Sequence, residues 1–167
     1  MNDHFAAGAF FAFNPDGWEW YVLGVTNIRY PSIVKLPGGT NKEFPKETPG
    51  ETLKREFKEE TGLKTLGEFL QVYSVRIPGG VLGSMHTKYF YLVKKISGDF
   101  PFGDVREFDD GGCKLRVRWW NLQDFERALL TNHKDGFTKA FIAMANFDEK
   151  FCQDNLDMVD RYSRIKC

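Results

Sequence analysis

The chain has 167 residues, with 23 basic and 23 acidic side chains, and this size favours one domain with a sizeable core. The balanced charge excludes a bulk basic surface for DNA or for a membrane as the basis of function. The apolar run at 5–13 is too short to span a membrane, and it lacks the basic leader and cleavage site of a signal peptide.

The chain alternates between strand-like and helix-like patterns. Runs rich in apolar and β-branched residues predict strands at 5–13, 18–26, 33–36, 69–77, 88–95 and 115–120. Periodic apolar positions and capping residues predict helices at about 49–61, 121–130, 136–147 and 149–164. Glycine-rich or Asp-rich segments predict a turn at 14–17 and loops at 77–83 and 97–112. This order predicts an α+β fold, layered as an α/β/α sandwich, with one domain over 1–167.

The composition adds two expectations. The 16 phenylalanines predict a Phe-rich core more than a binding surface. The cysteines are odd in number and widely spaced, without a metal-ligand pattern, at Cys113, Cys152 and Cys167. We therefore expect reduced thiols, as in a cytoplasmic protein.

The helix at about 49–61 has the clearest boundaries. Thr48 suits the N-cap, Pro49 suits the first helical position, and Glu51 completes a capping box with Thr48. Gly62 follows the last turn, where a left-handed residue commonly ends a helix. The sequence thus predicts both ends of this helix.

One face of that helix is acidic. Glu56, Glu59 and Glu60 fall within an arc of about 100° at the α-helical repeat. Leu53 and Phe57 form a neighbouring apolar strip that can anchor the helix to a core. The arc has three interpretations: a solvated surface, a scaffold that binds a partner protein, or a site for a hard divalent cation. The cation offsets the repulsion between carboxylates, so the third interpretation accounts for their clustering.

Residues 36–63 resemble the Nudix box, usually written G-x5-E-x7-R-E-U-x-E-E-x-G-U with U apolar. The lead-in at 36–39 is similar to the usual loop, and the fixed positions from the first box glutamate onward all match, as Glu47, Arg55, Glu56, Phe57, Glu59, Glu60, Gly62 and Leu63. Seven residues, 40–46, separate Gly39 from Glu47, where the family has five, and Asn41 stands in the place of the glycine. We interpret this as a two-residue insertion, because loops absorb such changes better than helices.

The resemblance implies a Nudix-type, MutT-like mixed β-sheet between helices, and Mg²⁺-dependent hydrolysis of a diphosphate linkage, with Mn²⁺ as an alternative ion. The implied metal ligands are the main-chain carbonyl of Gly39 and the carboxylates of Glu56, Glu59 and Glu60. Glu59 and Glu60 are also expected to be essential for catalysis. Arg55 is expected to pair with Glu47 and to orient the helix and loop.

A separate general base is expected, because carboxylates that coordinate a metal are poor proton acceptors. By resemblance, it comes from a loop before a late strand that carries a Trp, and here that loop holds Asp104, Glu107, Asp109 and Asp110. Glu107 is the first choice, because the run Glu107-Phe108-Asp109 resembles the segment that carries this carboxylate in some relatives. Asp109, Asp110 and the box glutamates stay open as alternatives.

The resemblance implies a small-molecule nucleotide as substrate, and a nucleotide sugar or a molecule of the ADP-ribose type is favoured. The segments at 76–83 and 97–112 could shape a site beyond one nucleotide, which is the reason for this preference. Alternatives are a (d)NTP, a less favoured RNA 5′-triphosphate end, or a non-catalytic nucleotide-binding domain. No DNA or membrane partner is expected, and a monomer and a homodimer both fit.

Several side chains could contact such a substrate, although each also fits a role in the core or on the surface. The aromatic candidates are Trp18, Trp20, Tyr21, Tyr73, Tyr89 and Tyr91. The basic candidates are Arg29, Arg76, His86 and Lys88.

Overall fold

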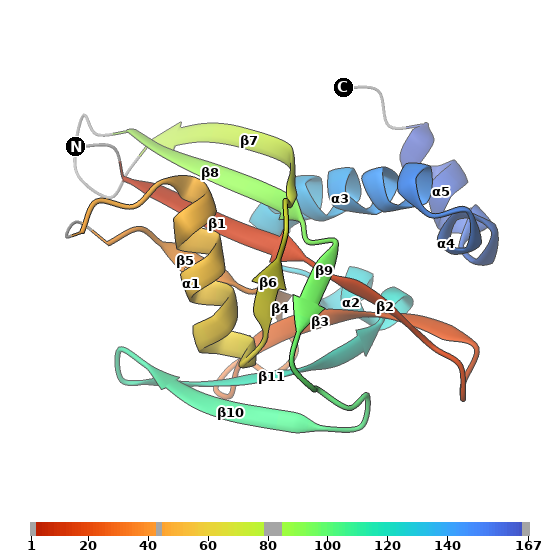
Figure 1. Cartoon of the computed structure of the whole chain (residues 1–167), viewed down its shortest axis with the longest axis horizontal. Coiled ribbons are helices and arrows are strands. Elements are labelled where there is room, and N and C mark those ends of the chain that lie inside the picture. Colours follow the sequence, from red (N-terminus) through yellow and green to blue (C-terminus); the bar gives the residue numbers. More distant parts are fainter. Residues whose placement is uncertain (1–2, 43–44, 79–84, 165–167) are drawn as a thin grey trace.

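The computed structural model describes residues 3–42, 45–78 and 85–164. Its central layer is a mixed sheet in the order β5 (Gly38–Thr40), β1 (His4–Ala9), β8 (Met85–Leu92) and β7 (Leu70–Pro78). Strands β1 and β8 run parallel, and the other two pairs are antiparallel. Helix α1 (Pro49–Thr61) covers one face of this sheet and α3 (Lys134–Phe147) covers the other (Figure 1).

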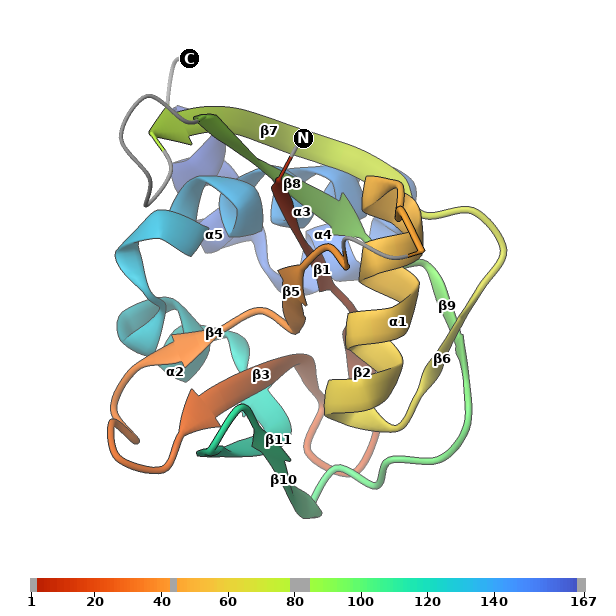
Figure 2. The same cartoon turned by 90° about the vertical axis from the view of Figure 1, so that its left-hand side faces the viewer.

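A second sheet crosses beside α1, and all its strand pairs are antiparallel (Figure 2). Its order is β10 (Val105–Asp110), β11 (Cys113–Asn121), β3 (Glu19–Asn27) and β2 (Phe11–Asn14), and β4 (Val34–Lys35) also pairs with β3. A short ribbon joins β6 (Lys64–Leu66) and β9 (Lys95–Ser97). The remaining helices are α2 (Leu122–Ala128), η1 (Thr131–His133), α4 (Glu149–Asp154) and α5 (Leu156–Ser163).

Strand alternation sends side chains of the central sheet into two separate cores. Ala6 of β1 packs in the core under α1, whereas its neighbour Ala7 packs in the core under α3. Leu53 and Phe57 of α1 are fully buried in the first core, so the predicted apolar strip is confirmed. Phenylalanines dominate the second core, with Phe11, Phe90, Phe125, Phe137, Phe141 and Phe151. The first core holds α1 against β1 and β5.

The predicted helix at 49–61 is confirmed at both ends. Thr48 accepts a hydrogen bond from the Glu51 N–H and completes the capping box, and Pro49 occupies the first turn. Gly62 ends the helix at φ 75°, a left-handed conformation that a side chain would strain. Helices on both faces of a mixed sheet confirm the predicted α+β sandwich.

Several sequence predictions differ from the structure. The strand at 5–13 is two strands, β1 and β2, which break at Phe10 and join different sheets. The loop predicted at 97–112 contains β10, and the glycine-rich lead-in forms β5. The C-terminal helix is divided at Asn155 into α4 and α5. Most of the predicted 77–83 connection lies outside the described residues.

No helix in the described ranges is both long and apolar enough to cross a membrane. Of the three cysteines, Cys113 and Cys152 are free thiols, and Cys167 lies outside the described residues.

Candidate active site

The acidic face of α1 packs against the backbone of β5. A Cβ on Gly39 would lie 2.4–2.7 Å from the carboxyl atoms of Glu56, so only glycine fits at this point. The Glu60 side chain is 4% exposed, and its Oε1 accepts a hydrogen bond of 2.6 Å from the Gly38 N–H. Two of the predicted metal-ligand carboxylates are therefore held directly beside the glycine pair.

Burial makes these two carboxyl groups harder to ionise. Burial raises the pKa of Glu60 to about 8, while the Lys35 ammonium and the Gly38 N–H act in the opposite direction. Burial also raises the pKa of Glu56, against the effect of the Arg55 guanidinium. The charge of Asp110 also raises both pKa values.

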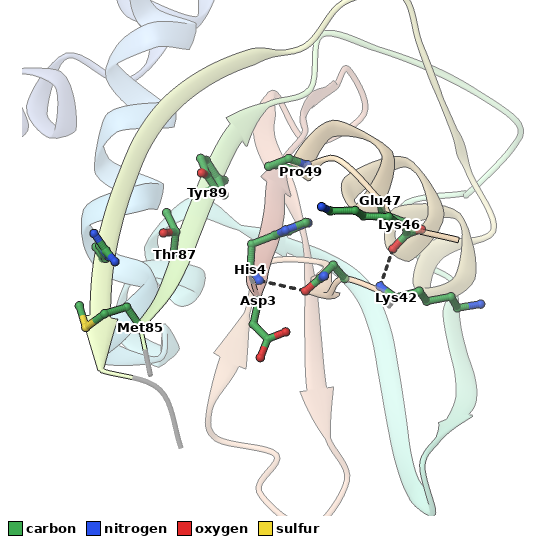
Figure 3. A pocket seen from close by; sticks show the side chains of 11 residues that line it. Asp3, His4, Lys42, Lys46, Glu47, Pro49, Met85, Thr87 and Tyr89 are labelled. Atoms are coloured by element: carbon green, nitrogen blue, oxygen red, sulfur yellow. Dashed lines mark hydrogen bonds between the residues drawn. The ribbon is translucent and has the colours of Figure 1, made fainter. Parts of the chain in front are cut away.

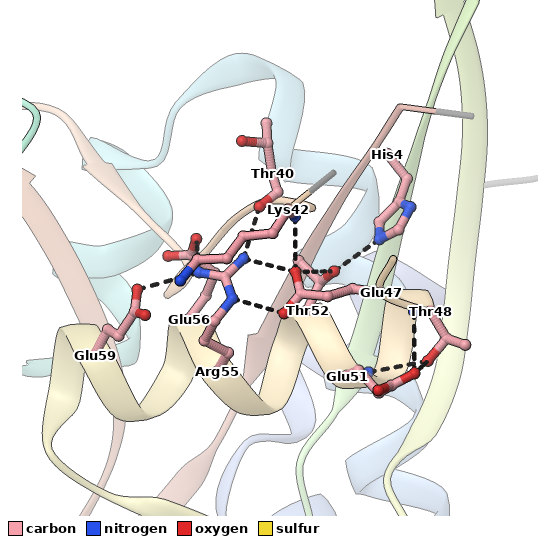
Figure 4. Close-up of polar contacts among 10 residues, drawn as sticks. All are labelled: His4, Thr40, Lys42, Glu47, Thr48, Glu51, Thr52, Arg55, Glu56 and Glu59. Carbon is pink, nitrogen blue, oxygen red and sulfur yellow. Dashed lines mark hydrogen bonds and ion pairs between the residues drawn. The ribbon is translucent and has the colours of Figure 1, made fainter. Parts of the chain in front are cut away.

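Arg55 and Glu47 form the predicted pair, with two hydrogen bonds (Figure 4). Arg55 Nε lies 2.7 Å from Glu47 Oε2, and Arg55 Nη2 lies 2.9 Å from Glu47 Oε1. The Lys42 N–H and the Thr52 hydroxyl also donate to Glu47 Oε1, at 2.8 and 3.2 Å. Pairing with Arg55 holds the pKa of Glu47 at about 2. The inserted residues have thus not displaced Glu47 from the helix.

Arg55 also contacts the acidic face of α1 and the strand β5 beside it. Its Nη1 lies 2.7 Å from Glu56 Oε1 and 3.2 Å from Glu59 Oε2, and its Nη2 donates to the Thr40 carbonyl at 2.9 Å. The Glu59 side chain is 51% exposed, so it is the most accessible of the three box carboxylates. One guanidinium therefore joins the loop, the strand β5 and the acidic face.

The donors fit a hard divalent cation in chemistry. Within the described ranges, no three His, Cys, Asp or Glu side chains stand close enough together to hold a metal ion as they are. The oxygen donors nevertheless share one region of negative charge, because Glu59 and Asp110 raise the pKa of Glu56, and Glu56 raises that of Glu60. Carboxylate and carbonyl oxygens are the ligands that Mg²⁺ and Mn²⁺ take.

The structure argues against Glu107 as the base. Glu107 lies on strand β10, where its Oε1 accepts two hydrogen bonds from Arg116, at 2.8 and 3.2 Å. Side chains alternate along a strand, so Glu107 points away from the face of Arg106 and Asp110. That face adjoins α1, because Arg106 Nη1 donates to the Thr61 carbonyl at 2.9 Å. Asp110 is therefore on the β10 face toward α1, and its charge acts on the box glutamates Glu56 and Glu60. From the sequence, Asp110 was only an alternative to Glu107.

The described part of the chain has several cavities near this region, including one of about 390 Å³ at Glu47 and Arg55 that is also lined by Glu51, Lys54, Lys58, Lys64 and Thr65. Two other cavities lie at the start of α1 and beside β4. The larger has a volume of about 430 Å³ and lies beside the start of α1, lined by Asp3, His4, Asn41, Lys42, Lys46, Glu47, Pro49, Arg76, Met85, Thr87 and Tyr89 (Figure 3). The smaller, about 220 Å³, is lined by Val25, Asn27, Tyr30, Ile33, Lys35, Leu115 and Leu130. The smaller cavity is near Glu60, because its Lys35 stands three residues before Gly38, whose N–H donates to the Glu60 carboxylate.

Few of the substrate candidates named from the sequence line these cavities. Arg76 and Tyr89 line the larger one. Trp20 and Tyr91 are buried in the two cores, and Trp18 is 77% exposed on the turn before β3. The remaining candidates line neither cavity, namely Tyr21, Arg29, Tyr73, His86 and Lys88.

Sequence reasoning missed Lys35, Tyr30 and His4. Lys35 directly precedes the Leu-Pro-Gly-Gly lead-in, and that position is a signal that could have placed it near the metal-ligand face. Tyr30 lies in the turn between β3 and β4, beside Asn27 and Ile33 of the same cavity. His4 gave no local signal, because the pairing of β1 with the distant β8 brings it to its cavity.

Comparison with known proteins agrees with the geometry. A family model described as NUDIX domain matches residues 3–141. The human protein "Nucleoside diphosphate-linked moiety X motif 6" is 30% identical over 118 residues, which cover 63% of this chain and 35% of that protein. The chain therefore matches about a third of the length of this curated relative.

Two solved structures show the shared fold at low sequence identity. A MutT NUDIX hydrolase from Burkholderia pseudomallei is 19% identical, with a TM-score of 0.56 over 83% of this chain and 98% of that chain. The NUDIX domain of Shewanella oneidensis NrtR, complexed with ADP ribose, is 17% identical, with a TM-score of 0.58 over 89% and 90%. Together with the family match over most of its length, these findings show that the chain belongs to the NUDIX family.

Proposed function

We propose that the protein is a Mg²⁺-dependent hydrolase that cleaves the diphosphate linkage of a nucleoside diphosphate joined to another group. The observation that carries this proposal is the packing of Glu56 and Glu60 against the Gly38–Gly39 backbone, in a chain of the NUDIX family. The printed name of the human relative and the ADP ribose bound to the NrtR domain support a substrate of the nucleotide-sugar or ADP-ribose type.

In this proposal the box carboxylates and the Gly39 carbonyl hold the metal. Mg²⁺, when bound, supplies positive charge against the diphosphate and acidifies water. Arg55 orients Glu56 and Glu59, and Glu47 holds Arg55 in place. These residues act through position and charge, since a buried bidentate pair fixes a guanidinium more firmly than a single contact does.

Asp110 is the proposed proton acceptor. It lies on the β10 face toward α1, and its charge raises the pKa of Glu56 and of Glu60. In the described part of the chain, no cationic side chain lies within ion-pair distance of Asp110. A carboxylate outside the metal ligands keeps its basicity, which a general base requires. Glu107, by contrast, is held by Arg116, and this pairing lowers its pKa.

The smaller cavity is the proposed place of the nucleoside. Tyr30 and Ile33 line it and are 62% and 45% exposed, so their apolar surfaces are accessible to a base. Lys35 lines this cavity and stands three residues before Gly38, whose N–H donates to Glu60, so its ammonium is available to a phosphate oxygen.

A hydrolysis screen with Mg²⁺ tests this function. It compares ADP-ribose, nucleotide sugars, dinucleoside polyphosphates, (d)NTPs including oxidised ones, and 5′-triphosphorylated RNA. We expect turnover of a diphosphate-linked substrate, abolished by EDTA. Activity on triphosphates alone would overturn the substrate class, and nucleotide binding without any turnover would indicate a non-catalytic domain.

A further inference from the structure

The cavity of about 430 Å³ beside the start of α1 has no role in the proposed reaction. Its floor is one row of side chains across three strands, since Arg76 of β7 pairs with Thr87 of β8, which pairs with His4 of β1. Tyr89 lies two residues after Thr87 and points to the same face of the sheet. Figure 3 shows Pro49 and Lys46 on the opposite wall.

The cavity is polar and carries an excess of positive charge. Lys42, Lys46 and Arg76 line it, and within the described part of the chain no carboxylate lies within ion-pair distance of any of them. Of its two acidic side chains, Glu47 is already neutralised by Arg55, which leaves Asp3. Ligand sites of this volume are common in proteins, and cations among hydroxyl and amide groups suit a phosphorylated, hydrophilic ligand.

The cavity wall is joined to the acidic face of α1 by a chain of hydrogen bonds. His4 Nε2 lies 2.8 Å from Thr52 Oγ1, and the Thr52 hydroxyl donates to Glu47 Oε1 at 3.2 Å. Glu47 in turn holds Arg55, which contacts Glu56 and Glu59 (Figure 4). A ligand that moved His4 or the segment carrying Glu47 would therefore change the position of Arg55.

The segment 40–46, which contains the two-residue insertion, contributes Asn41, Lys42 and Lys46 to the lining of this cavity. Asn41 Oδ1 accepts a hydrogen bond of 2.9 Å from the His4 N–H, and the Asn41 N–H donates to the His4 carbonyl at 3.0 Å. These two bonds extend the β1–β5 pairing beyond Thr40 and place Lys42 at the cavity edge. The departure from the family spacing thus coincides with the basic side of the cavity.

We propose that this cavity is a second, anion-binding subsite that takes a phosphorylated sugar-sized group, and that its occupation is transmitted to Arg55 through His4, Thr52 and Glu47. The group is either the distal part of the substrate or a separate phosphorylated effector. Only the first of these sources rests on the proposed function.

Binding of ribose 5-phosphate, measured by calorimetry in EDTA, tests the subsite without metal or turnover. Arg76→Gln and Lys46→Gln should each weaken binding by about tenfold, because each removes one charge-assisted contact. Arg164→Gln on α5 removes the same charge far from the cavity and should bind as the wild type does. Equal affinity in all four proteins, or no binding by the wild type, would overturn the proposal.

Inhibition kinetics with a substrate from the screen then distinguish the two sources. If the subsite takes part of the substrate, ribose 5-phosphate should raise KM and leave kcat unchanged. If it takes an effector, kcat should change instead. Either effect should be lost in Arg76→Gln, and its persistence in that variant would contradict the subsite. A protein without any turnover would refute the proposed function, while the calorimetric result would still decide the subsite.

Discussion

At the residue scale, strand alternation distinguishes carboxylates that look equivalent in the sequence. Glu107 and Asp110 lie three positions apart on β10, so they point to opposite faces. Glu107 pairs across the strands with Arg116, whereas Asp110 adds its charge to the region of Glu56 and Glu60. This distinction could not be predicted from the sequence, because its pattern predicts a loop where the chain forms strand β10.

The first prediction follows from that difference. Asp110→Asn should lower kcat by about 10²-fold or more with little change in KM, because general-base catalysis contributes about 10²–10⁴-fold. Glu107→Gln is the matched control and should turn over nearly as fast as the wild type. Steady-state kinetics with the pH–rate profile of each variant measure this. A normal kcat in Asp110→Asn and a large loss in Glu107→Gln would restore Glu107 as the base.

At the element scale, the junction between the inserted segment and α1 depends on one ion pair. The Glu47 side chain is 9% exposed and that of Arg55 is 19% exposed, so the pair is largely shielded from water. Shielded bidentate pairs couple more strongly than exposed ones.

The second prediction concerns this pair. Glu47→Ala and Arg55→Ala should be non-additive in the free energy of unfolding, with a coupling above about 0.5 kcal/mol, because either substitution removes the same bidentate pair. Urea denaturation of the two single variants and the double variant measures the coupling. Thr48→Ala is a useful comparison, since it weakens the same helix end through its cap alone. Additive effects of the Glu47 and Arg55 substitutions would mean that the pair does not form in solution.

The elements differ in how far the sequence could predict them. Helix α1 was predicted to the residue, because its cap, Pro49 and Gly62 are local signals. Strands β5 and β6 contain three residues each and gave no such signal. They exist because a distant strand pairs with them, β1 in the first case and β9 in the second. The acidic face of α1 was predictable for the same reason as α1, whereas the larger cavity depended on the pairing of distant strands.

At the scale of the whole molecule, a buried histidine connects the C-terminal helices to the lead-in of the box. His133 is 2% exposed, and its Nδ1 accepts a hydrogen bond of 3.2 Å from the Leu36 N–H. The rings of Phe5 and Phe90 lie 5.4 and 5.3 Å from its ring. Burial lowers its pKa to about 3, and the charges of nearby lysines act in the same direction.

The third prediction is a dependence of stability on pH. An unfolded histidine takes up a proton near pH 6.5, whereas His133 in the folded protein stays neutral down to about pH 3. Its contribution to stability is therefore complete above about pH 6.5 and is lost as the pH falls toward 3, by up to about 1.4 kcal/mol per pH unit.

His133→Asn keeps an acceptor for the Leu36 N–H and removes the titrating ring. Between pH 7 and 4.5, the free energy of unfolding should fall less in this variant than in the wild type, measured by denaturant titration at each pH. Parallel curves for the two proteins would show that His133 titrates normally in the fold.

The central claim is that the carboxylate face of α1 performs Mg²⁺-dependent cleavage of a diphosphate. The most direct measurement is the initial rate on the best substrate of the screen, as a function of Mg²⁺, for the wild type, Glu60→Gln and Glu68→Gln. Glu60→Gln removes a ligand charge without loss of volume, so it should lower turnover by about 10²-fold or more while the fold persists. Glu68→Gln changes an exposed glutamate beyond the helix and should leave the rate unchanged. A near-normal rate for Glu60→Gln at saturating substrate, or a wild-type rate independent of Mg²⁺, would contradict the claim.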